Sequence, residues 1–435
     1  MKSTTEPQNI IESVPAHGKK RKGKKIFMKI LSVFLAVVIL FVGVTTVLTV
    51  VFLNSAIKKA KLIPNAGCAE LKIDNYADGC WNIYSDDGLK VLQFTDVHLG
   101  GGWMSKNKDA MAVNAVAAII TAEKPDLVIV TGDAAYPVPF QAGTFNNKSG
   151  AKLLAEFMES LGVYWTLCFG NHDTEAYSYY SREDMAEFYS SGAYPHCLFQ
   201  SGPSDVDGSG NQVINVVNSD GIITRSFIIL DSHSYVDGDF LGIQWKYDNL
   251  HENQVAWYKS TVEALSEKNR AVVSGLDAKT AEKYSSLSGV VPTSMFLHIP
   301  LTEYKDAWTQ YSENGFKDTA DVKYNYGVAG ESGKIVYCGI HNDNMFETML
   351  SLGSTDSVFC GHDHLNNFSL NYKGINLTYG MSIDYLAYSG ISKQGSQRGC
   401  TILDIAPDGE ITFERSNYYQ DKYVPLTPKE SVTMQ

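Results

Sequence analysis

Hydrophobic positions along the chain alternate between short apolar runs and segments of helix length. Strand-like runs begin at KVLQF and recur as DLVIV, VYWTLCF, SFIIL, SMFL and SVFC, with segments such as 107–123 and 151–161 between them. This alternation is typical of a layered α/β domain with central strands buried on both faces. Later runs (INLTYGMS, CTILDI, EITFE) are separated by turn signals and predict antiparallel closing strands. The pattern predicts an α/β domain over 89–415 and a C-terminal tail over 416–435.

A much longer apolar run precedes this domain. Residues 30–53 hold no charge, and 24 residues at about 1.5 Å each can cross a hydrocarbon layer of roughly 30 Å. Seven basic residues lie at 19–29, just before the run, and three follow it at 58–61, so the positive-inside rule leaves the N-terminus in the cytoplasm. We expect a cytoplasmic basic tail over 1–29, a transmembrane helix over 30–53 and a stalk over 54–88. The alternative is a cleaved secretory signal, which usually has an apolar region of 7 to 15 residues; both interpretations predict export.

The charge is divided between these regions. Residues 1–61 hold 11 of the 36 Lys and Arg but two of the 48 Asp and Glu, which gives +9, whereas the remaining residues carry −21. Such an acidic surface repels polyanions. The composition therefore argues against a nucleic-acid scaffold, and the basic run next to the anchor is typical of topology signals and of contact with anionic lipid headgroups.

Five apolar runs end in residues that bind metals. The clusters are Thr95-Asp96-Val97-His98, Gly132-Asp133, Gly170-Asn171-His172-Asp173, His298 and Gly361-His362-Asp363-His364. A single cluster of this kind is more often a turn or a helix cap. Because ligands bind outside the carboxyl ends of the strands in open α/β sheets, we expect the five clusters to converge in one crevice.

The converging side chains predict two metal ions. Three Asp or Asn side chains and four imidazoles form the candidate set: Asp96, His98, Asp133, Asn171, His298, His362 and His364. This mixture suits borderline ions such as Fe, Zn or Mn, whereas Ca²⁺ and Mg²⁺ prefer oxygen ligands. Seven side chains are more than one tetrahedral ion takes. Two neighbouring ions can activate a bridging water and clamp phosphoryl oxygens.

The ordered set Asp-x-His, Gly-Asp, Gly-Asn-His-Asp, His and Gly-His-x-His resembles the calcineurin-like metallophosphoesterase superfamily. The resemblance covers roughly residues 90–414 and implies a layered α/β/β/α sandwich. The segments LHIPLTEYKDAW, FCGHDHLNNF and VLQFTDVHLG are similar to fungal and plant phosphatases grouped with the purple acid phosphatases.

The resemblance also implies a role for each candidate residue. Asp96, His98 and His364 hold the first metal in such a site, and Asn171, His298 and His362 hold the second. Asp133 bridges both metals. His172 faces the leaving oxygen of the phosphate ester as the catalytic acid, and Asp173 fixes the tautomer of His172.

Tyr136 raises a question about the first metal. Gly132-Asp133-x-x-Tyr136 matches the place where purple acid phosphatases carry a tyrosinate ligand to ferric iron, but those enzymes usually lack the histidine of Asp-x-His. Because Tyr136 and His98 compete for one coordination position, we expect His98 to be the ligand and Tyr136 to line the pocket.

These features together predict a membrane-anchored, exported phosphoric ester hydrolase of the cell membrane. The expected substrate is a small phosphomonoester or phosphodiester, and membrane lipid surrounds the anchor. The alternative is a catalytically inactive surface binding or sensor protein on a phosphoesterase scaffold, which predicts missing ligands; all seven are present. The sequence leaves open the metals, the choice between monoester and diester, and the oligomeric state.

The distribution of basic residues around 30–53 generates a test of topology. Protease added to intact cells is expected to release the folded domain and to leave a short protected N-terminal stub. Detection with one antibody against each end of the chain measures both products. Digestion that begins only after the membrane has been permeabilised would place the domain inside the cell.

Overall fold

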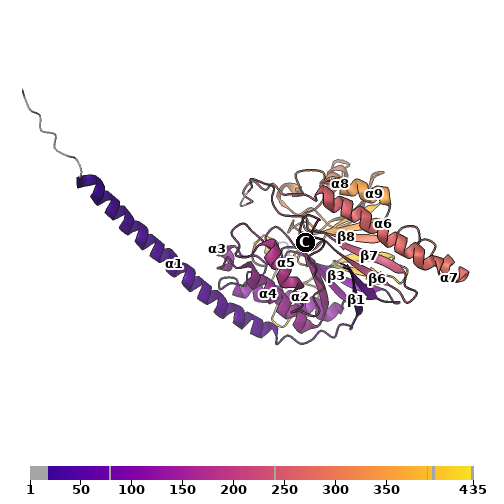
Figure 1. Cartoon of the computed structure of the whole chain (residues 1–435), viewed down its shortest axis with the longest axis horizontal. Helices are drawn as coiled ribbons and strands as arrows, with labels where there is room; N and C mark the ends of the chain where they lie inside the picture. The colour runs from indigo at the N-terminus through magenta and orange to yellow at the C-terminus, as the bar shows by residue number, and fades with distance from the viewer. Residues whose placement is uncertain (1–17, 78–79, 240–241, 389, 394–396, 433–435) are drawn as a thin grey trace, which may run out of the picture. The chain divides into compact units, whose positions relative to one another are not determined.

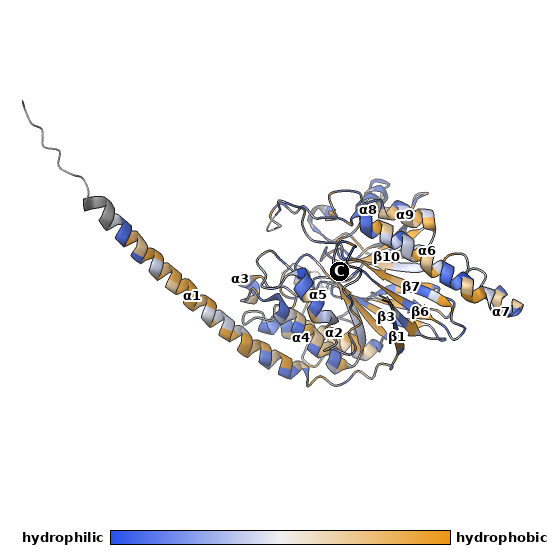
Figure 2. Cartoon of the chain, in the orientation of Figure 1, coloured by the Kyte–Doolittle hydropathy of each residue, from blue (hydrophilic) through white to orange (hydrophobic). Residues whose placement is uncertain are grey.

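A computed structural model describes residues 18–77, 80–239, 242–388, 390–393 and 397–432. Contacts divide the chain into a first unit, Met1–Leu48, and a second unit, Thr49–Gln435. Helix α1 (Gly18–Ala60) begins in the first unit, and its segment Gly23–Ala60 is long and apolar enough to cross a membrane (Figure 2). A signal sequence passes the same test, so α1 confirms a candidate span and leaves its cleavage open. Residues 1–17 of the predicted basic tail lie outside the described residues.

The second unit contains a smaller sheet with the strand order β14-β13-β3-β4-β5. Its strands are β3 (Leu89–Phe94), β4 (Leu127–Thr131), β5 (Tyr164–Cys168), β13 (Gly399–Ile405) and β14 (Ile411–Asn417). Strands β3, β4 and β5 are parallel, and β13 pairs antiparallel with both β3 and β14. The predicted antiparallel closing strands therefore extend the sheet that begins with β3.

The larger sheet has nine strands in the order β1-β2-β6-β7-β8-β10-β12-β11-β9. The bounds are β1 (Lys72–Ala77), β2 (Cys80–Tyr84), β6 (Gln212–Val217), β7 (Ile223–Ile229), β8 (Thr293–Phe296), β9 (Val322–Tyr326), β10 (Thr355–Cys360), β11 (Ser369–Tyr372) and β12 (Ile375–Tyr379). Strands β7, β8, β10 and β12 are parallel to one another, so their carboxyl ends share one edge.

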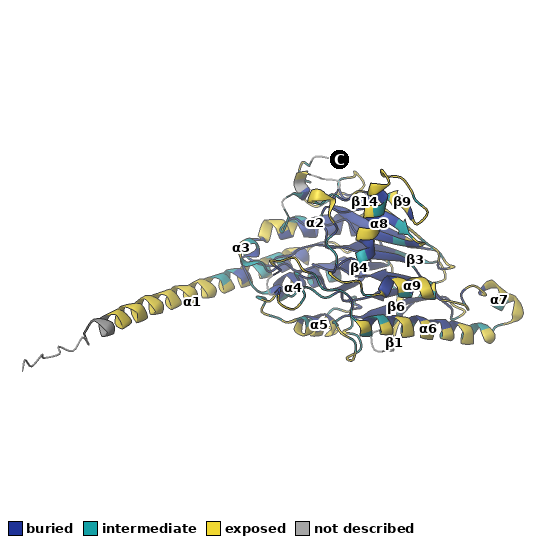
Figure 3. Cartoon of the chain, turned by 90° about the horizontal axis from the view of Figure 1, so that it is seen from above, coloured by how far each residue is buried: buried dark blue, intermediate teal, exposed yellow. Residues whose placement is uncertain are grey.

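Helices cover the outer faces of both sheets (Figure 1). The smaller sheet carries α2 (Lys106–Glu123), α3 (Pro139–Ala142), α4 (Asn147–Leu161) and α5 (Arg182–Ser190) in the segments around it. The larger sheet is accompanied by α6 (Glu252–Ser274), α7 (Ala278–Lys283), α8 (Thr302–Glu313) and α9 (Met345–Leu352). Phe94 packs with α2 and α4 on one face of β3, while Val91 packs in the cluster between the two sheets with Phe227 and Phe296. The layers are helix, sheet, sheet and helix, which confirms the predicted α/β/β/α sandwich, with strands buried on both faces (Figure 3).

Two flanking segments differ from the sequence expectation. Within the expected stalk (54–88), β1 and β2 pair with each other, and β2 joins β6 at the edge of the larger sheet. Neither strand has a run of fully buried apolar residues, since β1 forms the edge of the sheet and β2 is only partly buried, so the sequence pattern did not reveal them. The expected tail (416–435) also packs on the domain: Tyr418 and Tyr423 are buried, and the backbone of Leu426 donates to Asn114 of α2.

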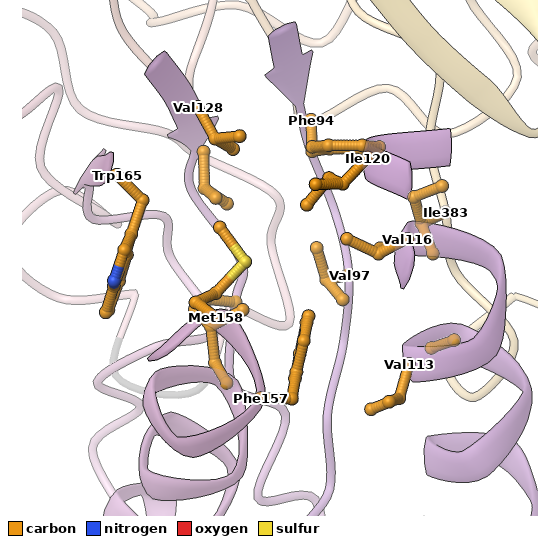
Figure 4. Close-up of a cluster of buried hydrophobic side chains, with 14 of the residues drawn as sticks. Phe94, Val97, Val113, Val116, Ile120, Val128, Phe157, Met158, Trp165 and Ile383 are labelled. Atoms are coloured by element: carbon orange, nitrogen blue, oxygen red, sulfur yellow. The ribbon is translucent and has the colours of Figure 1, made fainter. Parts of the chain in front are cut away.

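The cluster between the smaller sheet and its helices generates a test of stability. Phe157 of α4 is fully buried beside Met158 and Val97 (Figure 4). Phe157→Ala is expected to lower the free energy of unfolding by about 3–5 kcal/mol, because it removes buried surface and leaves a cavity. Phe140 of α3 is the matched control: it is 88% exposed, and Phe140→Ala should change stability by less than about 0.5 kcal/mol. Denaturant titration of both variants measures the difference; equal losses would contradict this core.

Candidate metal centre

The predicted ligands lie at the carboxyl ends of strands from both sheets. Asp96 and His98 follow β3, Asp133 follows β4, Asn171 follows β5, His298 follows β8, and His362 and His364 follow β10. All are buried except the partly buried His364. Four of them have left-handed backbones, with φ between 49° and 77°: Asp96, His98, Asp133 and His362. Residues other than glycine rarely adopt this conformation, and strain of this kind concentrates at functional sites.

Asp133 lies between two halves of the cluster. One half holds the ligands expected for the first metal (Asp96, His98 and His364), and the other holds those expected for the second (Asn171, His298 and His362). Its Oδ2 lies 3.2 Å from Nε2 of His98, on the smaller sheet, and 3.2 Å from Nε2 of His298, on the larger sheet. Its Oδ1 accepts the backbone N–H of His172 at 2.8 Å. The carboxylate thus lies where a bridging ligand is expected, in reach of both predicted metal positions.

The half of the cluster around His298 presents nitrogen and oxygen ligand atoms. Nδ1 of His298 lies 2.8 Å from the carbonyl oxygen of Thr131, which can only accept, so Nδ1 carries a hydrogen and Nε2 is the nitrogen directed at the cluster. That Nε2 lies 3.2 Å from Oδ1 of Asn171 and 3.3 Å from Nδ1 of His362. The amide nitrogen of Asn171 donates to the hydroxyl of Tyr235 at 3.0 Å, which turns Oδ1 of Asn171 towards the cluster.

The half of the cluster around Asp96 also consists of ligand atoms that lie close together. Nε2 of His364 lies 3.5 Å from Oδ1 of Asp96, a buried oxygen with no hydrogen-bond partner. Asp96, His98, Asp133 and His364 each offer a ligand atom, and these atoms lie within 4.8 Å of one another.

Asp384 holds two of these histidines from behind. Its two oxygens lie 3.4 Å from Nδ1 of His98 and 3.4 Å from Nδ1 of His364, so both rings direct Nε2 towards the cluster. Burial alone raises the pKa of a carboxyl group, but His98 and His364 hold the pKa of Asp384 well below its usual range. A carboxylate behind a ligating histidine fixes its orientation and raises its basicity. No sequence motif marks Asp384, which follows β12 some twenty residues after His364.

The donor set fits two metal ions. Imidazole nitrogens and carboxylate oxygens lie 3.2 Å apart on both sides of Asp133. Burial disfavours a charged ring, yet the carboxylate of Asp133 outweighs burial and raises the pKa of His298 to about 9, so without a metal ion a proton takes the place of the cation there. The cluster therefore favours positive charge between its ligand atoms, and these nitrogen and oxygen atoms are of the kind that Zn, Fe or Mn accept.

His172 lies beside the cluster with a partner that the sequence analysis did not identify. Nδ1 of His172 is 2.7 Å from Oε1 of Glu175, and Glu175 is buried. The resemblance gave the orienting role to Asp173, but the carboxylate of Asp173 accepts the backbone N–H groups of Asp133, Ala135 and Gly170 at 2.8–2.9 Å. Asp173 thus holds the loops that carry the ligands, and the contact with the imidazole belongs to Glu175, two residues further along the same loop.

Tyr136 lines the same region. Its hydroxyl donates to Oε1 of Gln141 at 2.8 Å, and its ring packs edge-on against His98 and His172, with centroids 4.8 and 4.9 Å apart. Burial raises the pKa of Tyr136 above its usual range. These contacts agree with a wall position for Tyr136.

The fold and this site define a scaffold of the metal-dependent phosphoesterases. A family model, calcineurin-like phosphoesterase, matches residues 89–366, and the chain belongs to that family. All seven predicted ligands, from Asp96 to His364, lie inside the matched range.

Curated relatives extend the comparison. The chain is 25% identical over 335 residues to "Probable inactive purple acid phosphatase 29" of Arabidopsis thaliana, covering 72% of this chain and 76% of the relative. It is 28% identical over 329 residues to "Probable inactive purple acid phosphatase 14" of the same plant, covering 71% and 73%. "Phosphatase DCR2" of Saccharomyces cerevisiae is 26% identical over 307 residues, covering 66% of this chain and 46% of the relative. The similarity to plant purple acid phosphatases confirms the subgroup resemblance.

Among solved structures, a dimetal phosphatase from Danio rerio is similar to this chain with a TM-score of 0.47 and 11% identity, covering 77% of this chain and 98% of that structure.

Proposed function

We propose that the chain is a membrane-anchored, exported two-metal phosphoesterase that hydrolyses phosphomonoesters or phosphodiesters. The observation that carries the proposal is the convergence of lone-pair atoms on both sides of Asp133, beside an imidazole, His172, that is held by a carboxylate of its own. The seven residues assigned to the metals are Asp96, His98, Asp133, Asn171, His298, His362 and His364. Metal ions bound by them supply Lewis-acid polarisation of phosphoryl oxygens and activation of water.

The residues of the chain divide the remaining work. The carboxylate of Asp384 lies 3.4 Å from Nδ1 of both His98 and His364, which favours the ring orientation that presents Nε2 to the centre. Oε1 of Glu175 accepts a hydrogen bond from Nδ1 of His172, so Nε2 is the nitrogen that can give a proton to the leaving oxygen. The side chain of His172 is 25% exposed, which leaves it within reach of a substrate.

The second candidate function is a binding or sensor protein without turnover. The Arabidopsis relatives are named as probable inactive purple acid phosphatases, and this favours the alternative. The ligand set and the pair of His172 with Glu175 favour hydrolysis. Turnover of a model monoester and a model diester, measured together with the metal content of the same sample, separates the two: bound metal with no turnover of any ester supports the binding protein.

The bridging position of Asp133 generates a test of metal content. Asp133→Ala is expected to abolish activity and to lower occupancy of both metals, whereas His364→Ala should reduce mainly one, because only the carboxylate serves both positions. Elemental analysis of the purified variants measures this. Asp306→Ala is the control, since Asp306 lies on the exposed side of α8, away from the centre. Full occupancy of both metals in Asp133→Ala contradicts the bridging role.

The pair of His172 with Glu175 generates a test of proton transfer. His172→Ala should keep its metals and lose the roughly 10²- to 10⁴-fold that a positioned general acid contributes. The loss should shrink for esters with good leaving groups, because such groups depart without a proton. Glu175→Gln should show the same dependence on the leaving group with a smaller loss.

Asp173→Asn distinguishes the two carboxylates. Because Asp173 accepts three backbone N–H groups, its replacement should lower the melting temperature and the metal content and leave the dependence on the leaving group intact. If Asp173→Asn instead reproduces the rate pattern of His172→Ala, and Glu175→Gln does not, the orienting role returns to Asp173.

A further inference from the structure

A polar pocket of about 640 Å³ shares two walls with the candidate metal centre. It is lined by residues of the segments 174–184 and 233–235 and by Asp248. Glu175 is one shared wall, since it also holds Nδ1 of His172. Tyr235 is the other, since its hydroxyl accepts from the amide of Asn171 and donates to Glu175 at 3.4 Å. A group that leaves the phosphate next to His172 therefore has this pocket beside it.

The charges lining the pocket are mostly negative. Glu175, Asp184 and Asp248 contribute carboxylates, and Oδ2 of Asp248 also lies 3.4 Å from Nε2 of His251, outside the lining. The one arginine of the lining, Arg182, forms a salt bridge with the buried Asp231 and donates also to the backbone carbonyl of Gly170, so its charge is already matched. Outside the lining, Lys148 lies with its amine over the ring of Tyr180, 5.0 Å from the centroid.

His233, the remaining basic group of the lining, is hydrogen-bonded to Gln254. Gln254 donates its amide hydrogens to Asn211 and to the carbonyl of Asp231, so its Oε1 accepts from Nε2 of His233 at 2.8 Å. The lining thus holds three carboxylates against two basic side chains, Arg182 and His233, and is acidic.

One carboxylate oxygen of the lining has no partner. The side chain of Glu175 is 4% exposed; its Oε1 faces His172, and its Oε2 forms no hydrogen bond. A buried carboxylate oxygen without a donor costs free energy, and a ligand that brings an N–H or O–H donor recovers it. Tyrosine rings of the lining, among them the exposed Tyr179, can add cation–π attraction.

We propose that this pocket receives the alcohol portion of the substrate and selects an alcohol that carries an ammonium group. The inference rests on the proposed hydrolytic function, because it places the alcohol next to His172. The acidic lining attracts a cation, tolerates a neutral hydroxyl and repels a second anion. The substrate class is an amino-alcohol phosphate ester.

A matched series of three monoesters tests the selection. 2-Aminoethyl phosphate, 2-hydroxyethyl phosphate and phosphoglycolate share a two-carbon leaving alcohol and differ in a terminal positive, neutral or negative group. Values of kcat/KM should fall in that order, with about 10-fold or more between the first and the last at low salt. The ratio should shrink at high ionic strength, because salt screens exposed charges.

Charge-neutral variants assign the preference to the pocket. Asp184→Asn and Asp248→Asn keep the size of each side chain and remove one charge, so each should reduce the ratio between the ammonium and carboxylate esters several-fold. Glu183→Gln is the control: Glu183 is the exposed neighbour of Asp184 and does not line the pocket, so the ratio should stay unchanged. A wild-type ratio of one or less overturns the proposal, as does a ratio that both pocket variants leave intact.

A separate measurement keeps this outcome apart from the failure of hydrolysis. Calorimetric binding of the three esters to the metal-loaded wild type gives the same order when no ester turns over. Hydrolysis of an aryl phosphate without any preference within the series overturns the pocket assignment and leaves the phosphoesterase intact. Binding in the predicted order without turnover of any ester retains the pocket and overturns the enzymatic function.

Discussion

The carboxylate of Asp133 contacts histidines from both sheets of this protein, and the rest of the metal centre is arranged around it. Its backbone N–H is held by Asp173, its Oδ1 accepts from the backbone of His172, and its Oδ2 lies between His98 of one sheet and His298 of the other. The close packing needs glycine on both sides. A Cβ on Gly170 would lie 2.2 Å from Oδ1 of Asp133, and a Cβ on Gly132, where φ is +81°, would lie 2.4 Å from the ring of His298. The glycines of Gly-Asp and Gly-Asn-His-Asp thus serve the approach of the ligands.

The strand-end pattern predicted the centre because its cause is local. Each ligand follows an apolar run directly, and the topology of parallel strands then brings the ends together. Asp384 and Glu175 had no such signal. Asp384 lies more than two hundred residues from His98 in the sequence and about twenty residues from His364. Glu175 lies in a loop, and the path of that loop brings it into contact with His172. Partners of ligands depend on loop geometry, which periodicity does not contain.

The strands, too, were predictable only where the sequence signal is local. Central strands such as β4, with every residue buried, were evident as apolar runs, whereas β1, β9 and β11 were not. β9 (Val322–Tyr326) exposes three of its five residues and ends the larger sheet. An edge strand is defined by its neighbour more than by its own composition. For that reason the segment 54–88 had the sequence of a stalk and the structure, in part, of a sheet edge.

The distribution of charge makes phosphate binding depend on the metals. The residues after 61 carry a net charge of −21, which repels a phosphate ester at long range. Asp96, Asp133 and Asp384 place three of these carboxylates at the centre itself, and no lysine or arginine among the described residues is hydrogen-bonded or ion-paired to a predicted ligand. Two divalent ions would reverse the sign of the centre, since their four positive charges exceed the three carboxylates. Changes at His172 or Glu175 that stop turnover would therefore leave a protein that still binds phosphate. Loss of the metals would remove binding and catalysis together.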